Sequence, residues 1–511
     1  MMEQTIGVKP ALRSGGVNRF TGFSGLSPAL RIRLALGAFL TLIVGTGLLA
    51  AGQAFLNDPD TLWHVSVGGD LWDEKAFPHL DPYSHSFAGE PWIAKEWLSQ
   101  AILFAAYALG GWNGVVLLTT GVLLIVLMQV YWPLSGAVKP VYAAGVAVAA
   151  FALCGDTFLA RPHIIALPVL IWFVYGVWSA GRRGRAPSFW LLAVLCLWSN
   201  MHGSFTFGFI AAGLTFLAYL FEHRRFADAQ TYRWIIFLAL CPFVSMIHPY
   251  GFEAIWSTII IMNNEAVPYI AEWRAFSAQE DRLVEFALLG GAAAAAATRI
   301  RLQLFTVLFL CLLAHMYLNH VRFSYILFTL APLLIAPEAA RQFALMSYRT
   351  WAAQIDQSGL ERAIAKHAAT ATAAFGLLLF IVMICGFSLA PWAPRQTYPL
   401  AAINAARDYG VTGNAMNGYS FGGALIFEKI PTFVDGRSDR LYQNGFMDKI
   451  ETARSAGGAE ALQALIREYD IGWTIYRPGD ARVKMLDDLP GWRRLYEDEY
   501  AVVHVMANAS G

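Results

Sequence analysis

Two aspartates separated by a single proline, Asp58-Pro59-Asp60, are the residues of this sequence best suited to chemistry. They open the segment 57–100, which contains eight carboxylates and two lysines, whereas the whole chain is 57% hydrophobic and only 14% charged. A carboxylate can act as a general base towards a hydroxyl group. A pair of carboxylates can also hold Mg²⁺ or Mn²⁺ through its oxygens. The segment therefore predicts either an acid–base site or a cation site.

A structural role for the same residues is the alternative. Pro59 would fix a turn, and Asp60 would cap a helix that begins at Thr61. His64 would then lie one helical turn after Asp60 on the same face. The following pair of glycines, 68–69, would allow another element to approach that face closely.

Further ionisable residues occur in short motifs at the ends of apolar runs. These motifs are Arg161-Pro162-His163, His202, His248, Glu272-Trp273-Arg274, His320 and Arg322. Arg161 and Arg322 could simply extend to the membrane interface. The histidines could assist chemistry or form hydrogen bonds to backbone in turns. No HExxH or CxxC spacing occurs, which argues against a structural zinc site.

The elements that must position these residues are membrane helices. The mean hydropathy is +0.47, and apolar runs of about 17–25 residues recur along the chain. We predict a mainly α fold, a polytopic transmembrane helical bundle of about eleven spans. Basic loops such as 181–185 and 222–233 mark the inner side, which places the N-terminus inside and the acidic segment outside. The five cysteines fall in apolar runs and suggest no disulfide framework.

Three parts of the chain follow from this topology. They are a basic cytoplasmic tail (1–33), a transmembrane domain (34–390) that includes the acidic extracytoplasmic loop 57–97, and a small extracytoplasmic α/β domain (391–511). In the last part we expect helices at 400–408 and 459–469 and strands at 424–427, 432–435, 472–476 and 501–505.

Two motifs of the C-terminal part leave their role open. The charged turn 434–440 could contact an acceptor or cover a cavity, or it could be a turn with surface ion pairs. The glycine-rich stretch 417–423 fits neither a Walker A nor a dinucleotide fingerprint. Basic residues are few and mostly follow the inner loops, so no nucleic-acid partner is expected.

Three spaced motifs directly after the first apolar run resemble a known family. They are Asp-Pro-Asp-x-x-Trp-His at 58–64, Pro-x-x-Asp-Pro-Tyr-Ser at 78–84 and Pro-Trp-x-x-x-Glu-Trp-Leu at 91–98. The pattern resembles the bacterial membrane glycosyltransferases of the GT-C superfamily, which are related to protein mannosyltransferases and lipid A aminoarabinose transferases. The resemblance extends to the motifs at 161–163, 198–203, 248–251 and 435–437.

The resemblance implies a function at the outer face of a bacterial cytoplasmic membrane. A sugar would pass from a polyprenyl-phosphate donor to a glycan, lipid or protein acceptor, with inversion expected from single displacement. Asp60 would act as catalytic base or as a ligand of Mg²⁺ or Mn²⁺, with Asp58 as its partner. The pocket for the substrates would be built by His64, Glu96, Arg161, His163, His202, His248, His320 and Arg322.

A transporter, or a non-catalytic component of envelope polysaccharide assembly, is the rival function. Transporters place their ionisable residues near the middle of the bilayer. In this sequence the ionisable motifs gather at one end of the predicted spans, which favours the glycosyltransferase.

Overall fold

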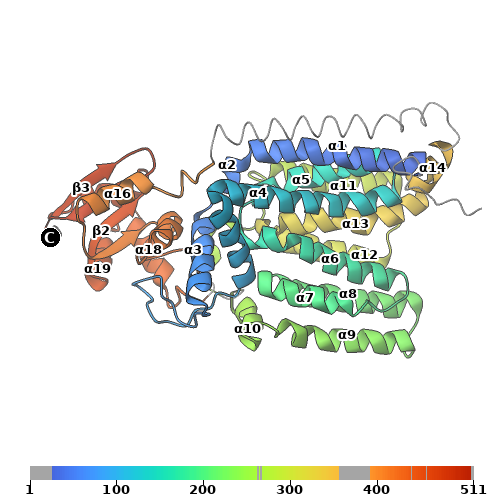
Figure 1. Ribbon diagram of the computed structural model, residues 1–511, viewed down its shortest axis with the longest axis horizontal. Helices are drawn as coiled ribbons and strands as arrows, with labels where there is room; N and C mark the ends of the chain where they lie inside the picture. Colours follow the sequence, from blue (N-terminus) through green and yellow to red (C-terminus); the bar gives the residue numbers. More distant parts are fainter. Residues whose placement is uncertain are drawn as a thin grey trace, which may run out of the picture.

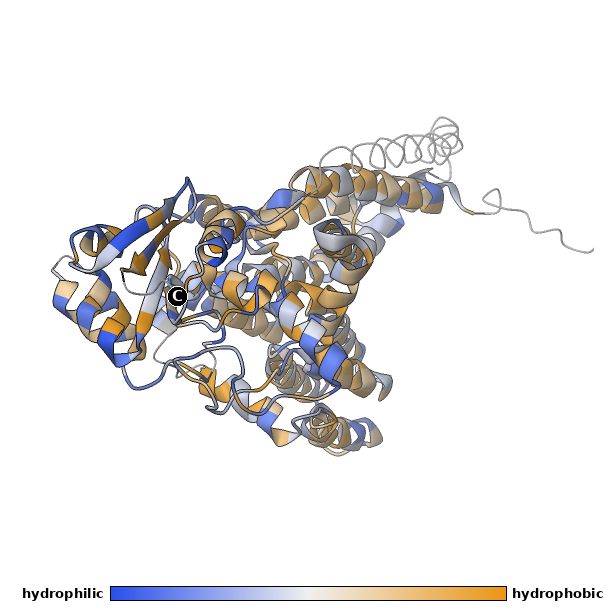
Figure 2. Cartoon of the chain, turned by 60° about the vertical axis from the view of Figure 1, so that its left-hand side comes forward, coloured by the Kyte–Doolittle hydropathy of each residue, from blue (hydrophilic) through white to orange (hydrophobic). Residues whose placement is uncertain are grey.

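The computed structural model describes residues 26–261, 264, 267–355, 392–438, 440–455 and 457–507. A bundle of long helices adjoins a small α/β unit, and helix α3 (Pro59–Glu74) lies between the two (Figure 1). The bundle helices are mainly hydrophobic, whereas the α/β unit mixes polar and apolar residues (Figure 2). The predicted span at 368–390 and most of the predicted basic tail lie outside the described residues.

Several bundle helices have the length and composition of membrane spans. Among the described residues, six helical stretches qualify: Pro28–Ala50, Trp97–Ala137, Pro140–Thr157, Pro162–Arg182, Phe205–His223 and Val321–Gln342. The corresponding helices are α1 (Pro28–Ala50), α4 (Trp97–Ala137), α5 (Pro140–Cys154), α6 (Pro162–Arg182), α8 (Phe205–His223) and α13 (Ser324–Gln342). The predicted polytopic helical class is confirmed, whereas the number of spans stays a prediction.

Shorter helices complete the bundle and its periphery. They are α2 (Gly52–Phe55), α7 (Trp190–Met201), α9 (Ala229–Ser245), α10 (Phe252–Ile260), α11 (Arg282–Thr298), α12 (Leu304–Asn319) and α14 (Tyr348–Ile355). Helix α1 begins at Pro28, six residues before the predicted start at Leu34, because the Ser27 side chain accepts a hydrogen bond from Leu30 N and proline suits the first helical position.

Helix α4 contains a break at two consecutive glycines. Gly110 and Gly111 have non-helical backbone angles, and Gly111 has φ +57°, a conformation that glycine adopts without strain. The first segment lies beside α3, and the second runs along the bundle (Figure 1). A Cβ on Gly68 of α3 would lie 2.2 Å from the Gln100 carbonyl oxygen, so this glycine allows the predicted close approach.

The α/β unit contains a four-stranded sheet in the order β1-β2-β4-β3. Strand β1 pairs with β2 in parallel, and β4 is antiparallel to both β2 and β3. The strands are β1 (Asn414–Asn417), β2 (Ile471–Tyr476), β3 (Trp492–Glu497) and β4 (Val502–Met506). The helices are α16 (Leu400–Asp408), α17 (Gly422–Phe427), α18 (Phe446–Arg454), α19 (Ala459–Glu468) and α20 (Ala481–Asp487).

Two of the four predicted strands are wrong. The helices at 400–408 and 459–469 and the strands at 472–476 and 501–505 are confirmed. Residues 424–427, however, belong to helix α17. This helix packs closely on α3 because Gly423 has no side chain; a Cβ there would lie 2.0 Å from the Pro59 carbonyl oxygen. Residues 432–435 form only an isolated bridge between Thr432 and Ser84.

The acidic loop packs into the α/β unit. Its buried side chains Trp92 and Ile93 share one apolar cluster with Phe433 and Tyr442 of the C-terminal part. Backbone hydrogen bonds join the two segments: His85 N donates to Thr432 O over 3.0 Å, and Thr432 N donates to Tyr83 O over 3.0 Å. The loop and the C-terminal part therefore form a single packed unit over the end of the bundle.

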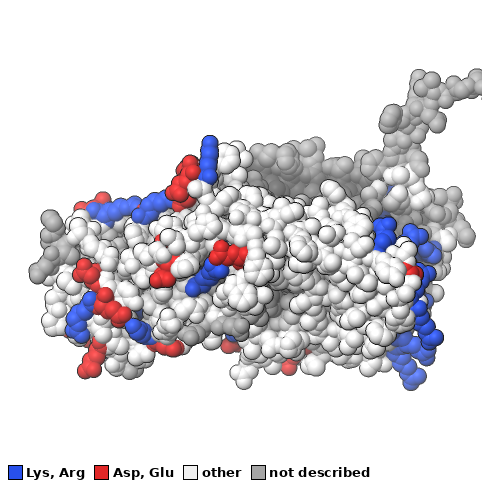
Figure 3. All heavy atoms as spheres, turned by 90° about the horizontal axis from the view of Figure 1, so that it is seen from below, with Lys and Arg blue, Asp and Glu red and all other residues white. Residues whose placement is uncertain are grey.

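Basic side chains mark the opposite end of the bundle. Lys and Arg gather there in Figure 3, whereas acids and bases are mixed over the α/β unit. Exposed Arg183 and Arg185 follow α6, and exposed Arg224 follows α8. The basic end and the α/β unit thus lie at opposite ends of the helices.

Candidate active site

The first turn of α3 separates the roles of the two aspartates. Asp58, and not Asp60 as predicted, caps the helix: Asp58 Oδ2 accepts hydrogen bonds from Thr61 N (2.9 Å) and Thr61 Oγ1 (2.8 Å). The cap lies two residues earlier because Pro59 already occupies the first helical position. Asp58 Oδ1 accepts a hydrogen bond from Arg161 Nε over 2.7 Å. Both oxygens of Asp58 are therefore engaged, and Asp60 is left to face the interior.

Arg161 lies among three carboxylates, and we call Asp58, Asp60, Arg161 and Glu272 the Arg161 cluster. Its Nη2 contacts Asp58 and is 3.2 Å from Asp60 Oδ2, while its Nη1 donates to Glu272. Burial alone would lower the pKa of Arg161, but the three carboxylates raise that pKa well above its usual value. The guanidinium is therefore permanently charged and fixed in place.

The two remaining carboxylates of the Arg161 cluster differ in protonation. Burial, opposed by Arg161 and reinforced by Asp58 and Glu272, raises the pKa of Asp60 to about 7. Burial also acts on Glu272, but Arg161 and Arg322 outweigh it and lower its pKa to about 2. Asp60 Oδ1 is buried and has no hydrogen-bond partner among the described residues. Asp60 can therefore exchange a proton near neutral pH, whereas Glu272 stays ionised.

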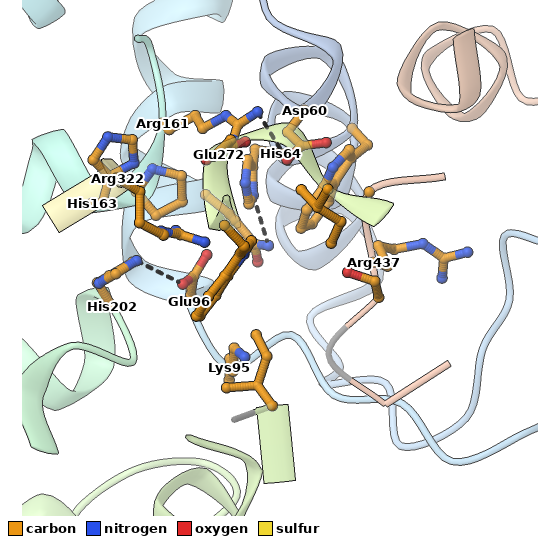
Figure 4. A pocket seen from close by; sticks show the side chains of 18 of the residues that line it. Asp60, His64, Lys95, Glu96, Arg161, His163, His202, Glu272, Arg322 and Arg437 are labelled. Carbon is orange, nitrogen blue, oxygen red and sulfur yellow. Dashed lines mark hydrogen bonds and ion pairs between the residues drawn. The ribbon is translucent and has the colours of Figure 1, made fainter. Parts of the chain in front are cut away.

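A central cavity of about 100 Å³ lies in front of Asp60. Side chains from α3, α6, the 202–204 turn and the C-terminal part surround it (Figure 4). Seven of the ten predicted site residues line it: Asp60, His64, Glu96, Arg161, His163, His202 and Arg322. Asp58 lies behind Arg161, outside the lining. The structure therefore brings most of these residues together at one cavity.

The cavity histidines have defined hydrogen-bond partners. His64 Nδ1 accepts from Gln100 Nε2 over 3.2 Å, and His202 Nδ1 accepts from Ser204 N over 3.1 Å. His202 Nε2 is then the protonated nitrogen and lies 3.3 Å from Glu96 Oε1. Burial lowers the pKa of both His64 and His202 well below the usual value, so both rings are neutral. His163 Nε2 lies 3.0 Å from the Thr157 carbonyl oxygen.

His248 and His320 do not line the central cavity, and their predicted role in substrate binding stays a prediction. His248 Nδ1 accepts from Tyr250 N, and its Nε2 donates to the Lys95 carbonyl oxygen over 3.1 Å. His320 Nδ1 donates to the Trp273 carbonyl oxygen over 2.7 Å. Both rings donate to backbone carbonyls of residues that line the cavity.

Several cavity residues were missing from the predicted set. Those nearest the acids are Glu272, Lys95 and Gln100, and the C-terminal part adds Tyr419, Gly436, Arg437 and Ser438. Glu272 lies beside an arginine motif at a predicted outer turn, which was a usable signal. Gly436 lies in the 435–437 motif, which does not indicate its place, and a Cβ there would lie only 1.8 Å from Asp60 Oδ1. The C-terminal part therefore touches the catalytic candidate directly.

In the charged turn at 434–440, Arg437 belongs to a buried ion network and not to a surface ion pair. Arg437 Nε and Nη2 donate to the two oxygens of Asp435 over 2.9 and 2.8 Å, and Nη1 contacts Asp81 of the acidic loop. All three side chains have 0% exposure. The guanidinium also lies 5.0 Å from the ring of Tyr83 and 5.1 Å from that of Trp92. We call Asp81, Asp435 and Arg437 the Arg437 cluster.

A larger groove of about 560 Å³ adjoins the central cavity, and we call it the amphipathic groove. Its polar end is shared with the cavity and includes Lys95, Glu96, His202, Trp273 and Arg322. Its apolar walls come from α8 and α12 and include Phe207, Ile210, Leu312 and Met316. His320 also lines this groove.

Arg322 is the cation at the junction of groove and cavity. Its guanidinium lies 4.4 Å from the ring centre of Trp273. Within the part of the chain that the structure describes, no carboxylate lies within ion-pair distance of it. This guanidinium is therefore oriented by an aromatic face and available to an anion.

Comparison with known proteins identifies solved structures of similar fold. No protein-family model and no curated protein matches the sequence. The apo oligosaccharyltransferase of Archaeoglobus fulgidus matches the structure with a TM-score of 0.52 at 10% identity, over 85% of this chain and 69% of that one. The chain therefore shares the fold of that oligosaccharyltransferase.

Two structures of ArnT from Cupriavidus metallidurans also match. The apo form gives a TM-score of 0.49 at 13% identity, over 92% of this chain and 98% of that one. The form bound to undecaprenyl phosphate gives 0.48 at 14% identity, over 94% and 98%. The fold predicted from the motifs of the acidic loop is thus confirmed by the archaeal match.

The predicted cation ligands, Asp58 and Asp60, do not fit a divalent cation in this structure. Among the described residues, no group of three or more His, Cys, Asp or Glu side chains is arranged to hold a metal ion. Asp58 has both oxygens engaged, and the Arg161 guanidinium lies between Asp58, Asp60 and Glu272.

Proposed function

We propose that this protein transfers a sugar from a polyprenyl-phosphate donor to a hydroxyl acceptor at the outer face of a bacterial cytoplasmic membrane. The observation that carries the proposal is Asp60, a buried carboxylate with one unpartnered oxygen, which lines a cavity adjoining an amphipathic groove. The GT-C fold agrees with this activity. The acceptor is a glycan, a lipid or a protein.

The amphipathic groove suits a lipid phosphate. The apolar side chains of α8 and α12 offer a surface for a prenyl chain, and the polar end offers cations for the phosphate. Arg322 can donate two parallel hydrogen bonds to phosphate oxygens, and Lys95 adds a second positive charge nearby. The donor would lie with its chain between the helices and its sugar in the central cavity.

Asp60 would act as the general base. It takes the proton of the acceptor hydroxyl while the acceptor oxygen forms a bond to the anomeric carbon and the bond from that carbon to the phosphate oxygen breaks. Polyprenyl phosphate leaves with the bonding electrons, and Arg322 stabilises its developing charge. A pKa of about 7 matches Asp60 to this task, because a base is most effective when its pKa is near the working pH.

Orientation in the membrane follows from the charge distribution. Basic side chains gather at the bundle end far from the α/β unit (Figure 3), and such clusters are typical of the cytoplasmic side. The N-terminus of α1 would then be cytoplasmic, and the α/β unit with the central cavity would be extracytoplasmic.

Replacing Asp60 tests the catalytic role. Purified full-length Asp60→Asn, supplied with a pool of polyprenyl-phosphate-linked sugars and extracted envelope acceptors, should transfer sugar about 10²–10⁴-fold more slowly than wild type. Asp73→Asn is the matched control, because Asp73 is an exposed carboxylate on the same helix. This control should transfer at the wild-type rate.

Two results would overturn the proposal. Undiminished transfer by folded Asp60→Asn would remove the base role. Absence of transfer by wild type in proteoliposomes, together with passage of the lipid-linked sugar across the bilayer, would favour the transporter.

A further inference from the structure

The Arg161 guanidinium is surrounded in the way that a metal ion in a carboxylate site would be. The carboxylates come from the start of α3 and from Glu272, elements far apart in the sequence, and all three meet one arginine at the N-terminal end of α6. Arg161 is buried, with 7% exposure, and Asp58 and Asp60 have 1% and 8%. The contacts are therefore internal to the fold.

The oxygens that a metal ion would need are already bonded to hydrogen donors. Asp58 Oδ2 accepts from the N-terminus of α3, and Asp58 Oδ1 accepts from Arg161 Nε. Glu272 Oε1 accepts from Arg161 Nη1. Of the two Asp60 oxygens, Oδ2 lies 3.2 Å from Arg161 Nη2, and only Oδ1 is without a partner.

Electrostatics also disfavours a divalent metal ion beside Asp60. A divalent ion at Asp60 would lie next to the fixed positive charge of Arg161, and like charges in a buried site repel strongly. The central cavity also contains Arg322 and Lys95, which already supply positive charge for a departing phosphate. The site therefore has its cations built into the chain.

We infer that Arg161 is the resident cation of this site and that the site binds and requires no divalent metal ion. Arg161 holds Asp58, Asp60 and Glu272 in their places, and it acts on the reaction as a positioning residue through Asp60. The statement that transfer requires no metal ion rests on the proposed function, whereas the statement that the site binds no metal ion does not.

Manganese binding to the purified full-length protein tests the inference without any sugar substrate. Free Mn²⁺, measured by electron paramagnetic resonance, should be depleted equally by wild type and by Asp60→Asn, since weak binding to exposed acids is common to both. One equivalent of Mn²⁺ bound by wild type and lost in Asp60→Asn would overturn the inference. Because no transfer is measured, this result is independent of the proposed function.

Transfer in the presence of a chelator gives the second test. With EDTA in excess, the wild-type rate should change less than twofold, and a loss of transfer that Mn²⁺ or Mg²⁺ restores would overturn the inference. Among variants whose thermal unfolding matches wild type, Arg161→Lys, which keeps the charge, should retain more activity than the neutral Arg161→Gln. Equal activity of Lys and Gln variants would contradict a cationic role, and the two wild-type measurements decide the question if neither variant folds.

Discussion

Two buried arginines, Arg161 and Arg437, each hold carboxylates from distant segments of the chain, and those carboxylates differ in their surroundings. In the Arg437 cluster, Asp435 accepts from the guanidinium with both oxygens and also from Thr432 Oγ1 over 2.7 Å. Burial would raise the pKa of Asp435, but Arg437 and these hydrogen bonds lower it. In the Arg161 cluster, Asp60 keeps one oxygen without a partner, and its pKa is raised to about 7.

This difference separates a structural role from a chemical one. A buried carboxylate whose oxygens are all bonded stays ionised and serves as a connection, here between the acidic loop and the C-terminal part. A buried carboxylate with one free oxygen is costly to keep charged and exchanges its proton near neutral pH. Burial and residue type alone do not distinguish the two carboxylates: Asp435 is bonded to its arginine through both oxygens, whereas Asp60 also meets the like charges of Asp58 and Glu272.

Breaking the Arg437 cluster should have the largest effect. Arg437→Ala leaves Asp81 and Asp435 buried without a counter-charge, which costs about 3–5 kcal/mol. We expect a clear fall in the thermal midpoint in detergent, together with loss of transfer. The control is Arg407→Ala, which removes a half-exposed pair with Glu428 and should cost at most about 1 kcal/mol. Equal midpoints for the two variants would contradict a structural role for Arg437.

Filling the space beside Asp60 should have the next largest effect. Gly436→Ala puts a methyl group where Asp60 Oδ1 lies, 1.8 Å from an ideal Cβ, so the carboxylate must move. Transfer should fall by about 10²-fold, as expected when a reacting group is displaced by about 1 Å. Gly418→Ala is the matched control, since its Cβ would meet only Tyr476 Cδ1 at 3.6 Å. Similar rates for the two variants would show that Gly436 does not position Asp60.

The smallest effect should come from pH. Because burial raises the pKa of Asp60 to about 7, this carboxyl is protonated below that pH and cannot accept a proton. The rate of transfer at low substrate should therefore rise about tenfold per pH unit up to about pH 7 and then level off. Glu272, with a pKa of about 2, stays ionised throughout this range. A rate that is constant between pH 5 and pH 8 would exclude Asp60 as the titrating base.

Part of the site follows from the sequence because topology places helix ends on one side of a membrane. Asp60, Arg161, His202 and Arg322 are far apart in the chain, yet each flanks an apolar run at the predicted outer side, and all line the central cavity. The sequence could not show which side chain turns inwards. His248 also lies at the predicted outer side of the membrane, but it is outside the cavity and its ring donates to the Lys95 carbonyl oxygen.

The sequence by itself determined the class of fold, the acidic loop after the first span, and the glycine at 68 that lets another element approach α3 closely. These depend on hydropathy, charge and backbone freedom, which are local properties of a segment. Only the tertiary structure decided that Asp58 caps α3 while Asp60 faces the cavity, and that Gly436 packs against Asp60. Asp81 and Arg437 meet although 356 residues separate them. Such contacts arise from the packing of whole elements, and no local pattern of residues encodes them.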